Sequence, residues 1–378
     1  MTNPFIATLP PMARLLLALP AIASLVCGVL SGLARVGLPM PDSIVRLVSV
    51  HGVLMIGGFF GTVIGLERAV ALRRLWPFAA PLFSGVAGLL LIGGAPASAA
   101  QGLLCLAAMV MLLACASVWR QQRMAHHATL AVAALCWLAG NFVWILAGVI
   151  APAVPLWTTF LLLTIAGERL ELSRFMPTPP RARTAFAGIV VAVLAGTAIA
   201  LADEAAGMRL FAAALCTLAL WLLRFDIARH TIKSSGLTRY MAACLLSGYL
   251  WLLLAATLGL AGALQPGSPL RDASLHALLL GFVFSMVFGH APIILPAVST
   301  LKFRWHAGFY VPLAALHLGL GARLFAGLTG SFALRQQAAI ANAIALVLFM
   351  MLVITSLRSS RQSRPDITPD SLQSPSRG

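Results

Sequence analysis

Two histidines occupy matching positions in two long apolar segments of the chain. His51 begins the segment HGVLMIGGFFGTVIGLERAVAL, and His276 begins HALLLGFVFSMVFGHAPIILPAV. Each is followed by a small residue, then by a Leu two positions further on and by a Gly at the sixth or seventh position. An ionisable side chain within hydrocarbon is costly without a partner, so it marks a candidate site. Imidazole is a usual axial ligand of haem iron, so the pair predicts a metal site holding one b-type haem.

The depth of the two histidines favours this pairing. At about 1.5 Å per residue, His51 lies roughly 9 Å into its segment and His276 roughly 6 Å into its own, measured from the same side. The simpler alternative is that both are buried histidines, each bonding a backbone carbonyl or a hydroxyl group. We expect the paired arrangement because the depth and the placement match.

His290 marks a second candidate site at the other end of its segment. It lies 14 residues after His276 in the sequence, which in an α-helix places it about 21 Å deeper and about 40° away around the axis. Pro292 and Pro296 follow it and leave carbonyl groups without donors. Irregular backbone at that depth must face protein or water. His290 is therefore either a metal or proton site or a cap at a kinked helix end.

Two Glu-Arg pairs also occur at the ends of apolar segments. Glu67-Arg68 ends one, and Glu168-Arg169 ends another in the related motif AGERLELSRF. Only ten acidic residues occur in the chain, so two in matched positions carry information. Ion pairs between helices would explain them, and an inner polar site of Glu67, Glu168 and His290 is the sharper hypothesis. An uninterrupted α-helix places Glu67 about 160° around the axis from His51.

The remaining histidines and the cysteines carry less information. His126, His127, His230 and His306 stand in polar or interfacial sequence, where a solvated position is expected, whereas His317 lies within an apolar segment and can bond a neighbouring helix. The six cysteines all fall in apolar segments without CxxC spacing. Small buried hydrophobes are the expected role for such cysteines.

The composition indicates the elements that must position these residues. The chain of 378 residues is 60% hydrophobic and 10% charged, with a mean hydropathy of +0.96, which is typical of a membrane protein. A spanning helix needs about 20 apolar residues. We predict an all-α bundle of about twelve spans, near 14–34, 45–66, 78–95, 99–119, 128–150, 153–167, 184–202, 207–223, 240–262, 272–298, 307–327 and 335–357.

The predicted spans leave no room for a soluble domain. Residues 1–357 form one transmembrane domain in this prediction, and the polar, Ser/Pro-rich residues 358–378 form a disordered tail. The first span follows a polar start that contains proline and lacks a convincing cleavage site, so no cleavable signal peptide is expected.

The net charge of +16 would suit a nucleic-acid partner, but its distribution argues against one. Under the twelve-span prediction, 20 of the 26 Lys and Arg residues fall in the loops on one side and six on the other. This is the positive-inside pattern of an inner (plasma) membrane protein with both termini in the cytoplasm. Anionic membrane lipids are the partners that such a surface attracts.

A weak internal repeat suggests how the spans are grouped. The second and sixth spans end in related Glu-Arg motifs, and the tenth begins like the second. These spans are four apart, so we expect three four-helix units in a pseudo-threefold arrangement. In the second span Gly57, Gly61 and Gly65 recur at intervals of four, which permits either close helix packing or a flat macrocycle.

Twelve spans in three units, with histidines at the ends of spans two and ten, resemble the catalytic subunit of haem-copper oxidases and nitric oxide reductases. In that superfamily the low-spin haem is held between these spans, which implies His51, in HGVLM, and His276 as ligands. Spans six and seven contain no histidine, so the superfamily's copper site is incomplete here. The closest pattern is the NnrS-like group of haem- and copper-containing membrane proteins. It implies a role in nitric oxide or respiratory metabolism, with respiratory-chain or denitrification proteins as partners.

Two other classes of function fit parts of the sequence. A secondary transporter or permease would use twelve spans, repeats and proline-broken helices without haem, although Asn141, Tyr249 and His317 are among few intramembrane polar groups. An assembly or scaffold protein of a respiratory complex would need neither ligand nor substrate. A haem spectrum distinguishes the first interpretation from both.

Overall fold

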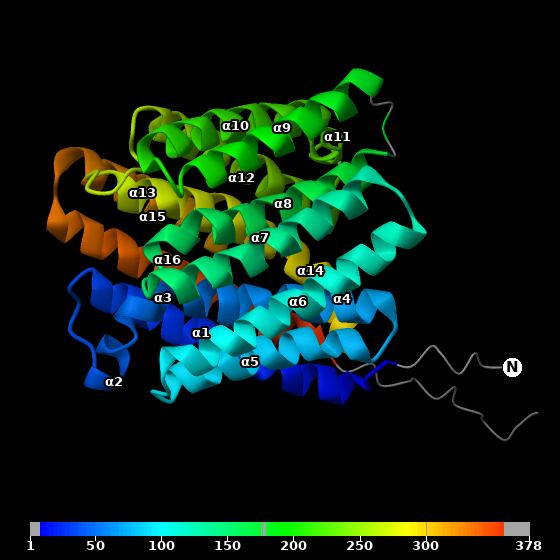
Figure 1. Cartoon of the computed structure of the whole chain (residues 1–378), viewed down its shortest axis with the longest axis horizontal. Coiled ribbons are helices and arrows are strands. Elements are labelled where there is room, and N and C mark those ends of the chain that lie inside the picture. The colour runs from blue at the N-terminus through cyan, green and yellow to red at the C-terminus, as the bar shows by residue number, and fades with distance from the viewer. Residues whose placement is uncertain (1–7, 175, 177–178, 300, 359–378) are drawn as a thin grey trace, which may run out of the picture.

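The computed structural model describes residues 8–174, 176, 179–299 and 301–358. These residues form one bundle of nearly parallel and antiparallel helices, with α9 (Pro180–Ile199) and α10 (Glu204–Phe225) along one side and α1 (Pro11–Arg35) and α5 (Ala79–Ile92) along the opposite side (Figure 1). The predicted tail from residue 359 onward lies outside the described residues.

Two spans are composite and contain the histidine pair. The first composite span consists of α2 (Asp42–Val45), η1 (Val48–Val50), α3 (His51–Val53), the π-helix η2 (Leu54–Gly61) and α4 (Thr62–Leu72). The second composite span consists of α13 (Arg271–His276), the π-helix η5 (Ala277–Phe284) and α14 (Ser285–Ser299).

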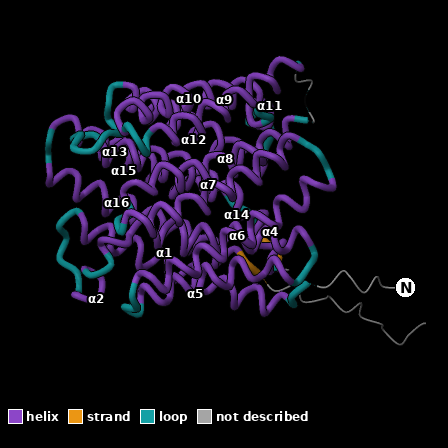
Figure 2. Tube along the Cα trace, viewed as in Figure 1, coloured by secondary structure: helices purple, strands orange, loops and turns teal. Residues whose placement is uncertain are grey.

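Most other spans are single α-helices (Figure 2). They are α6 (Ala97–Gln121), α7 (Ala125–Ala147), α8 (Val154–Ser173), α12 (Gly236–Leu260), α15 (Tyr310–Thr329) and α16 (Phe332–Ser356). Short elements join them, namely η3 (Trp76–Phe78), η4 (Ala151–Ala153), α11 (Ala228–Thr231) and η6 (Ala307–Phe309). The two-residue strands β1 (Lys302–Phe303) and β2 (Leu357–Arg358) pair antiparallel, with Lys302 opposite Arg358.

Ordinary capping chemistry sets many of the helix ends. The Asp203 carboxylate accepts a hydrogen bond from the Ala206 amide at the start of α10, and the Ser331 hydroxyl does the same for the Leu334 amide at the start of α16. Gly148 and Gly330 end α7 and α15 with φ of 70° and 68°, a left-handed conformation that glycine adopts without strain. The chain thus reverses direction where its sequence supplies caps.

Within the described residues, eleven helical segments are long and apolar enough to cross a membrane. The prediction of a multi-pass all-α membrane bundle is therefore confirmed at this level. The expected third span, 78–95, corresponds to the shorter apolar segment Trp76–Ile92. Whether it crosses the bilayer decides between eleven and twelve spans.

The spans that carry the candidate residues lie inside the bundle. In the α8 span 72% of the most apolar window is buried within the protein, the highest share among the eleven, followed by 61% for Arg271–Ser299. α8 contacts η5, and α4 contacts α14, while α1 packs against both α14 and α16. The first helix therefore meets the last, and the candidate residues face protein.

The π-helical segments change the angular relations that α-helical geometry predicts. Each contains eight residues and lies directly after, or three residues after, its histidine. A π-helix closes i→i+5 hydrogen bonds and turns less per residue than an α-helix. The predicted angles from His51 to Glu67 and from His276 to His290 are therefore wrong, because both assume an uninterrupted α-helix.

Candidate functional site

α1 fixes the orientation of His51. Its Nδ1 atom lies 2.7 Å from the carbonyl oxygen of Gly28. One turn further along α1, a Cβ on Gly32 would come within 2.9 Å of the His51 ring. The absence of a side chain at Gly32 lets α1 pack directly against the imidazole, and Nδ1–H is the donor to the Gly28 carbonyl.

His276 is fixed by its own helix and by an ion pair. Its Nδ1 atom lies 2.7 Å from the carbonyl oxygen of Asp272 and 3.3 Å from a carboxylate oxygen of the same residue. Arg323 of α15 binds both carboxylate oxygens of Asp272, at 2.7 Å and 3.1 Å. Because Arg323 is only 5% exposed, this bidentate pair holds Asp272, and with it His276, in a defined position.

The two histidines therefore share one hydrogen-bonding state. When Nδ1 carries the proton and donates it to a carbonyl, the lone pair of Nε2 remains available. Within the described residues, neither Nε2 atom makes a hydrogen bond. His276, Arg35 and Arg323 are all close enough to His51 for electrostatic interaction. The structure thus brings together two oriented imidazoles with free Nε2 atoms and two guanidinium groups.

Aromatic packing joins the two composite spans beyond the histidines. The rings of Phe59 and Phe284 stack with centroids 5.8 Å apart, and Phe60 meets Phe284 edge-on at 5.2 Å. All three residues are buried and lie in the π-helical segments. This contact holds η2 against η5 below the imidazole pair.

The glycines of the second span serve helix packing. Added Cβ atoms would meet Leu104 at Gly57, Ser84 and Trp137 at Gly61, and Pro81 at Gly65, with the closest atoms 2.5–3.1 Å away. Neighbouring side chains fill the space beside all three glycines. Of the two uses that the spacing permits, the structure favours close packing.

A second polar cluster lies at the opposite end of the two composite spans, where α8 joins them. Arg68 of α4 forms an ion pair with Glu168 of α8 and lies 4.0 Å from Glu67. Arg169 of α8 donates to the Nε2 atom of His290 over 2.8 Å. We call these five residues the inner network. It connects α4 with α8 and α8 with α14.

The direct partner of His290 is a guanidinium group rather than a carboxylate. Its Nδ1 atom lies 2.7 Å from the carbonyl oxygen of Met286. Arginine can only donate, so Nε2 must accept and Nδ1 must carry the proton. Glu168 lies within electrostatic range of His290. A metal ion at this Nε2 would have to displace Arg169, which disfavours His290 as a copper ligand.

Sequence reasoning missed two further members of this region, Asp226 and Tyr249. Both are fully buried and interact electrostatically with Arg169, and the Tyr249 hydroxyl lies close enough to the Asp226 carboxylate to interact with it. Burial raises the pKa of Asp226, which follows α10 and accepts a hydrogen bond from the Ala228 amide. The sequence feature that could have pointed to Asp226 is its position as an acidic residue within the basic sequence RFDIARH.

The raised pKa of Asp226 has a definite effect on stability. The folded protein binds this proton more tightly than the unfolded chain does, because burial disfavours the carboxylate. Stability contributed by this group is therefore present below its ordinary pKa and is lost as the pH rises through the raised value.

Two of the other histidines have defined environments. The His317 Nδ1 atom accepts from the Trp251 indole at 2.9 Å, and its Nε2 atom lies 3.0 Å from the Ser247 hydroxyl oxygen. Its hydrogen-bonding groups are satisfied, which indicates a structural role. His126 is only 4% exposed, so the expected solvated position is wrong for this residue, because α7 already begins at Ala125.

No group of three or more His, Cys, Asp or Glu side chains suited to a metal ion occurs in the described part of the chain. A metal held wholly by protein ligands is thus unsupported there. A porphyrin differs, since it supplies four ligands itself and needs only axial ones. Six free cysteines lie on helices, in agreement with their expected role as hydrophobes.

Comparison with known proteins gives a family but no function. The family model described as "Domain of unknown function (DUF8744)" matches residues 14–358. The chain belongs to this family. No curated protein and no solved structure matches it. The match covers every described helix except the first residues of α1, so this family is defined over the whole bundle.

Proposed function

We propose that this DUF8744 protein binds one b-type haem between His51 and His276 and takes part in electron transfer linked to nitric oxide or respiratory metabolism. The observation that carries the proposal is the matched state of the two imidazoles. Each donates Nδ1–H to a main-chain carbonyl and leaves Nε2 free, as histidine ligands of metals generally do.

The residues around the pair fit a haem. Gly32 allows α1 to approach His51, and the Gly28 carbonyl oxygen accepts its Nδ1–H. Asp272 orients His276 through its carbonyl and its carboxylate. Arg35 lies within electrostatic range of His51 and offers positive charge for the carboxylates of a porphyrin. A haem with two imidazole ligands supplies one-electron chemistry when bound. The protein's part is to orient the imidazoles and to keep the site within a low-dielectric bundle.

The number, grouping and orientation of the spans are also part of the proposal. Twelve spans in three four-helix units, both termini in the cytoplasm and an inner-membrane location agree with the charge distribution. The inner network supports the grouping, because it ties together spans two, six and ten. Respiratory-chain or denitrification proteins are the proposed electron partners. Copper is not included, since Arg169 already occupies the His290 Nε2 atom.

The absorption spectrum of purified protein, expressed with adequate haem supply, tests the proposal. We expect a Soret band and, on reduction, a sharp α band typical of low-spin haem. His51→Ala and His276→Ala should each abolish these bands. His230→Ala, which alters an exposed histidine in a basic loop, should leave them unchanged. A colourless protein, or equal losses in all three variants, would rule out the proposed haem.

A secondary transporter is the second candidate, and the inner network is the observation that favours it. A solute path needs polar groups within the bundle, and Arg169, Asp226 and Tyr249 supply buried ones. A colourless protein whose Arg169→Leu variant loses substrate-dependent thermal stabilisation would support this candidate over the haem protein.

A further inference from the structure

A cavity with a volume of about 420 Å³ lies near the end of the bundle that carries the inner network, between the start of α12 and the start of α15. Its volume falls within the range of about 300–1,000 Å³ that small-molecule sites usually have. The residues that line it are Ile232, Ser235, Gly236, Arg239, Ala243, Trp305 and Tyr310. None of them is acidic, and none lies near the two histidines of the proposed haem site in the sequence.

The polar side chains of the cavity can all donate hydrogen bonds, and two of them, Ser235 and Arg239, are exposed. The Trp305 Nε1 atom is buried and has no partner within the described residues. No hydrogen bond or ion pair in the described chain involves the side chains of Ser235, Arg239 or Tyr310. An indole N–H only donates, and a guanidinium group carries five donors and a permanent positive charge. Such a set of groups is complementary to an anion.

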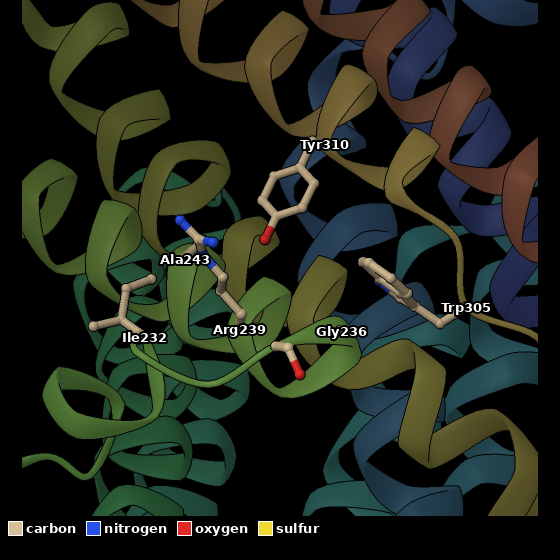
Figure 3. Close-up of a pocket in the computed structure, with 7 residues that line it drawn as sticks. Ile232, Gly236, Arg239, Ala243, Trp305 and Tyr310 are labelled. Carbon is tan, nitrogen blue, oxygen red and sulfur yellow. The ribbon is translucent and has the colours of Figure 1, made fainter.

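The positions of these groups converge on the cavity. In Figure 3 the Tyr310 hydroxyl points toward the Arg239 side chain, and Trp305 lies apart from both, to the right in this view. All three line the cavity. The backbone adds a further contribution at Gly236, the first residue of the 25-residue helix α12. The side chain of Ser235 does not cap this helix, so its first N–H groups and its dipole also favour negative charge.

The location of the cavity narrows the chemistry of the anion. Ile232 and Ala243 give the cavity apolar walls beside its donors. Lys233, Lys302 and Arg304 are exposed nearby in the sequence and would concentrate anions at this surface. A cavity between membrane-spanning helices that combines basic and apolar groups suits a phosphate group attached to an apolar body.

We propose that this cavity is a phosphate-binding site, in which Arg239, the Trp305 indole N–H and the Tyr310 hydroxyl hold the phosphate oxygens. The phosphodiester of an anionic membrane lipid and free inorganic phosphate share this chemistry. The site is independent of the proposed haem, so either proposal can fail without the other.

Native mass spectrometry of the full chain in detergent tests the site with phosphatidylglycerol, phosphatidylcholine or inorganic phosphate as the probe. We expect Arg239→Gln and Trp305→Phe each to weaken the binding of whichever probe the parent protein binds. The expected loss of affinity is about tenfold, the usual value of a hydrogen bond that involves a charged group. Arg120→Gln removes one exposed positive charge outside the cavity and should leave binding unchanged.

The three probes separate the sources of the phosphate. Preference for phosphatidylglycerol over phosphatidylcholine, with no competition from millimolar inorganic phosphate, assigns the site to an anionic lipid. Saturable binding of inorganic phosphate that both cavity variants weaken assigns it to the free ion. The proposal would be overturned if none of the three probes binds. It would also be overturned if Arg120→Gln weakens binding as much as Arg239→Gln does. The Trp305→Phe variant keeps an aromatic side chain, so it remains informative if Arg239→Gln fails to fold.

Discussion

At the scale of single residues, Asp272 has the most consequential position. It holds Arg323 through two hydrogen bonds and lies 3.3 Å from His276. The Arg323 side chain is 6% exposed and that of Asp272 is 30% exposed. The guanidinium group therefore depends on its partner more strongly than the carboxylate does, because a buried charge without a counter-charge is the costlier state.

This asymmetry predicts the order of stabilities in a double-mutant cycle. Asp272→Ala should destabilise the protein toward the lower end of the roughly 3–5 kcal/mol that breaking a buried pair costs. Arg323→Leu should cost less, and the double variant should recover part of the Asp272→Ala loss. Thermal unfolding in detergent provides the measurement.

Asp42→Ala serves as the control, since Asp42 is exposed and forms no ion pair within the described chain. Its unfolding temperature should match that of the parent. A double variant that loses the full sum of the two single losses would show that Asp272 and Arg323 do not depend on each other.

At the scale of elements, the two π-helices distinguish the composite spans from the other helices. η5 packs against α12 so closely that a Cβ on Gly281 would lie 2.6 Å from Trp251 atoms. The Trp251 indole in turn donates to His317. The shape of this segment is therefore held by side chains from neighbouring helices.

Gly281→Ala tests the closeness of this contact. The added methyl group must displace Trp251, so we expect a loss of about 1–3 kcal/mol in stability, the usual cost of overpacking a well-filled interior. Gly188→Ala is the matched control, because Gly188 lies on α9 with open space around it. Thermal unfolding should separate the two variants, and equal unfolding temperatures would contradict the packing described for η5.

The sequence predicts the positions of the spans well, but it does not predict the contacts between them. Span positions follow from hydrophobicity, so helices occur close to where the composition predicts them. The π-helices could not be predicted, because i→i+5 bonding depends on tertiary packing. The sequence explains Arg169 by the positive-inside pattern or by an ion pair between helices. Its contact with His290 could not be predicted, because it depends on how α8 and α14 face each other.

At the scale of the whole molecule, the described bundle has two polar ends joined by apolar spans. The imidazole pair lies at one end and the inner network at the other. Both use the two composite spans, and α8 adds Glu168 and Arg169 to the inner network. A change in the packing of η2 or η5 would therefore affect both ends together. Whether Trp76–Ile92 crosses the membrane determines the side on which each later loop lies.

The short segment Trp76–Ile92 makes this orientation testable. With twelve crossings, a reporter active only in the periplasm should give signal when fused after residues 40, 152, 204 or 268, and none after 125, 178 or 234. The reason is that the basic loops stay in the cytoplasm. If Trp76–Ile92 does not cross, the fusion after residue 40 keeps its signal while the six later fusions all reverse. Reversal of all seven would contradict the cytoplasmic termini and would place the histidine pair near the cytoplasmic side of the membrane.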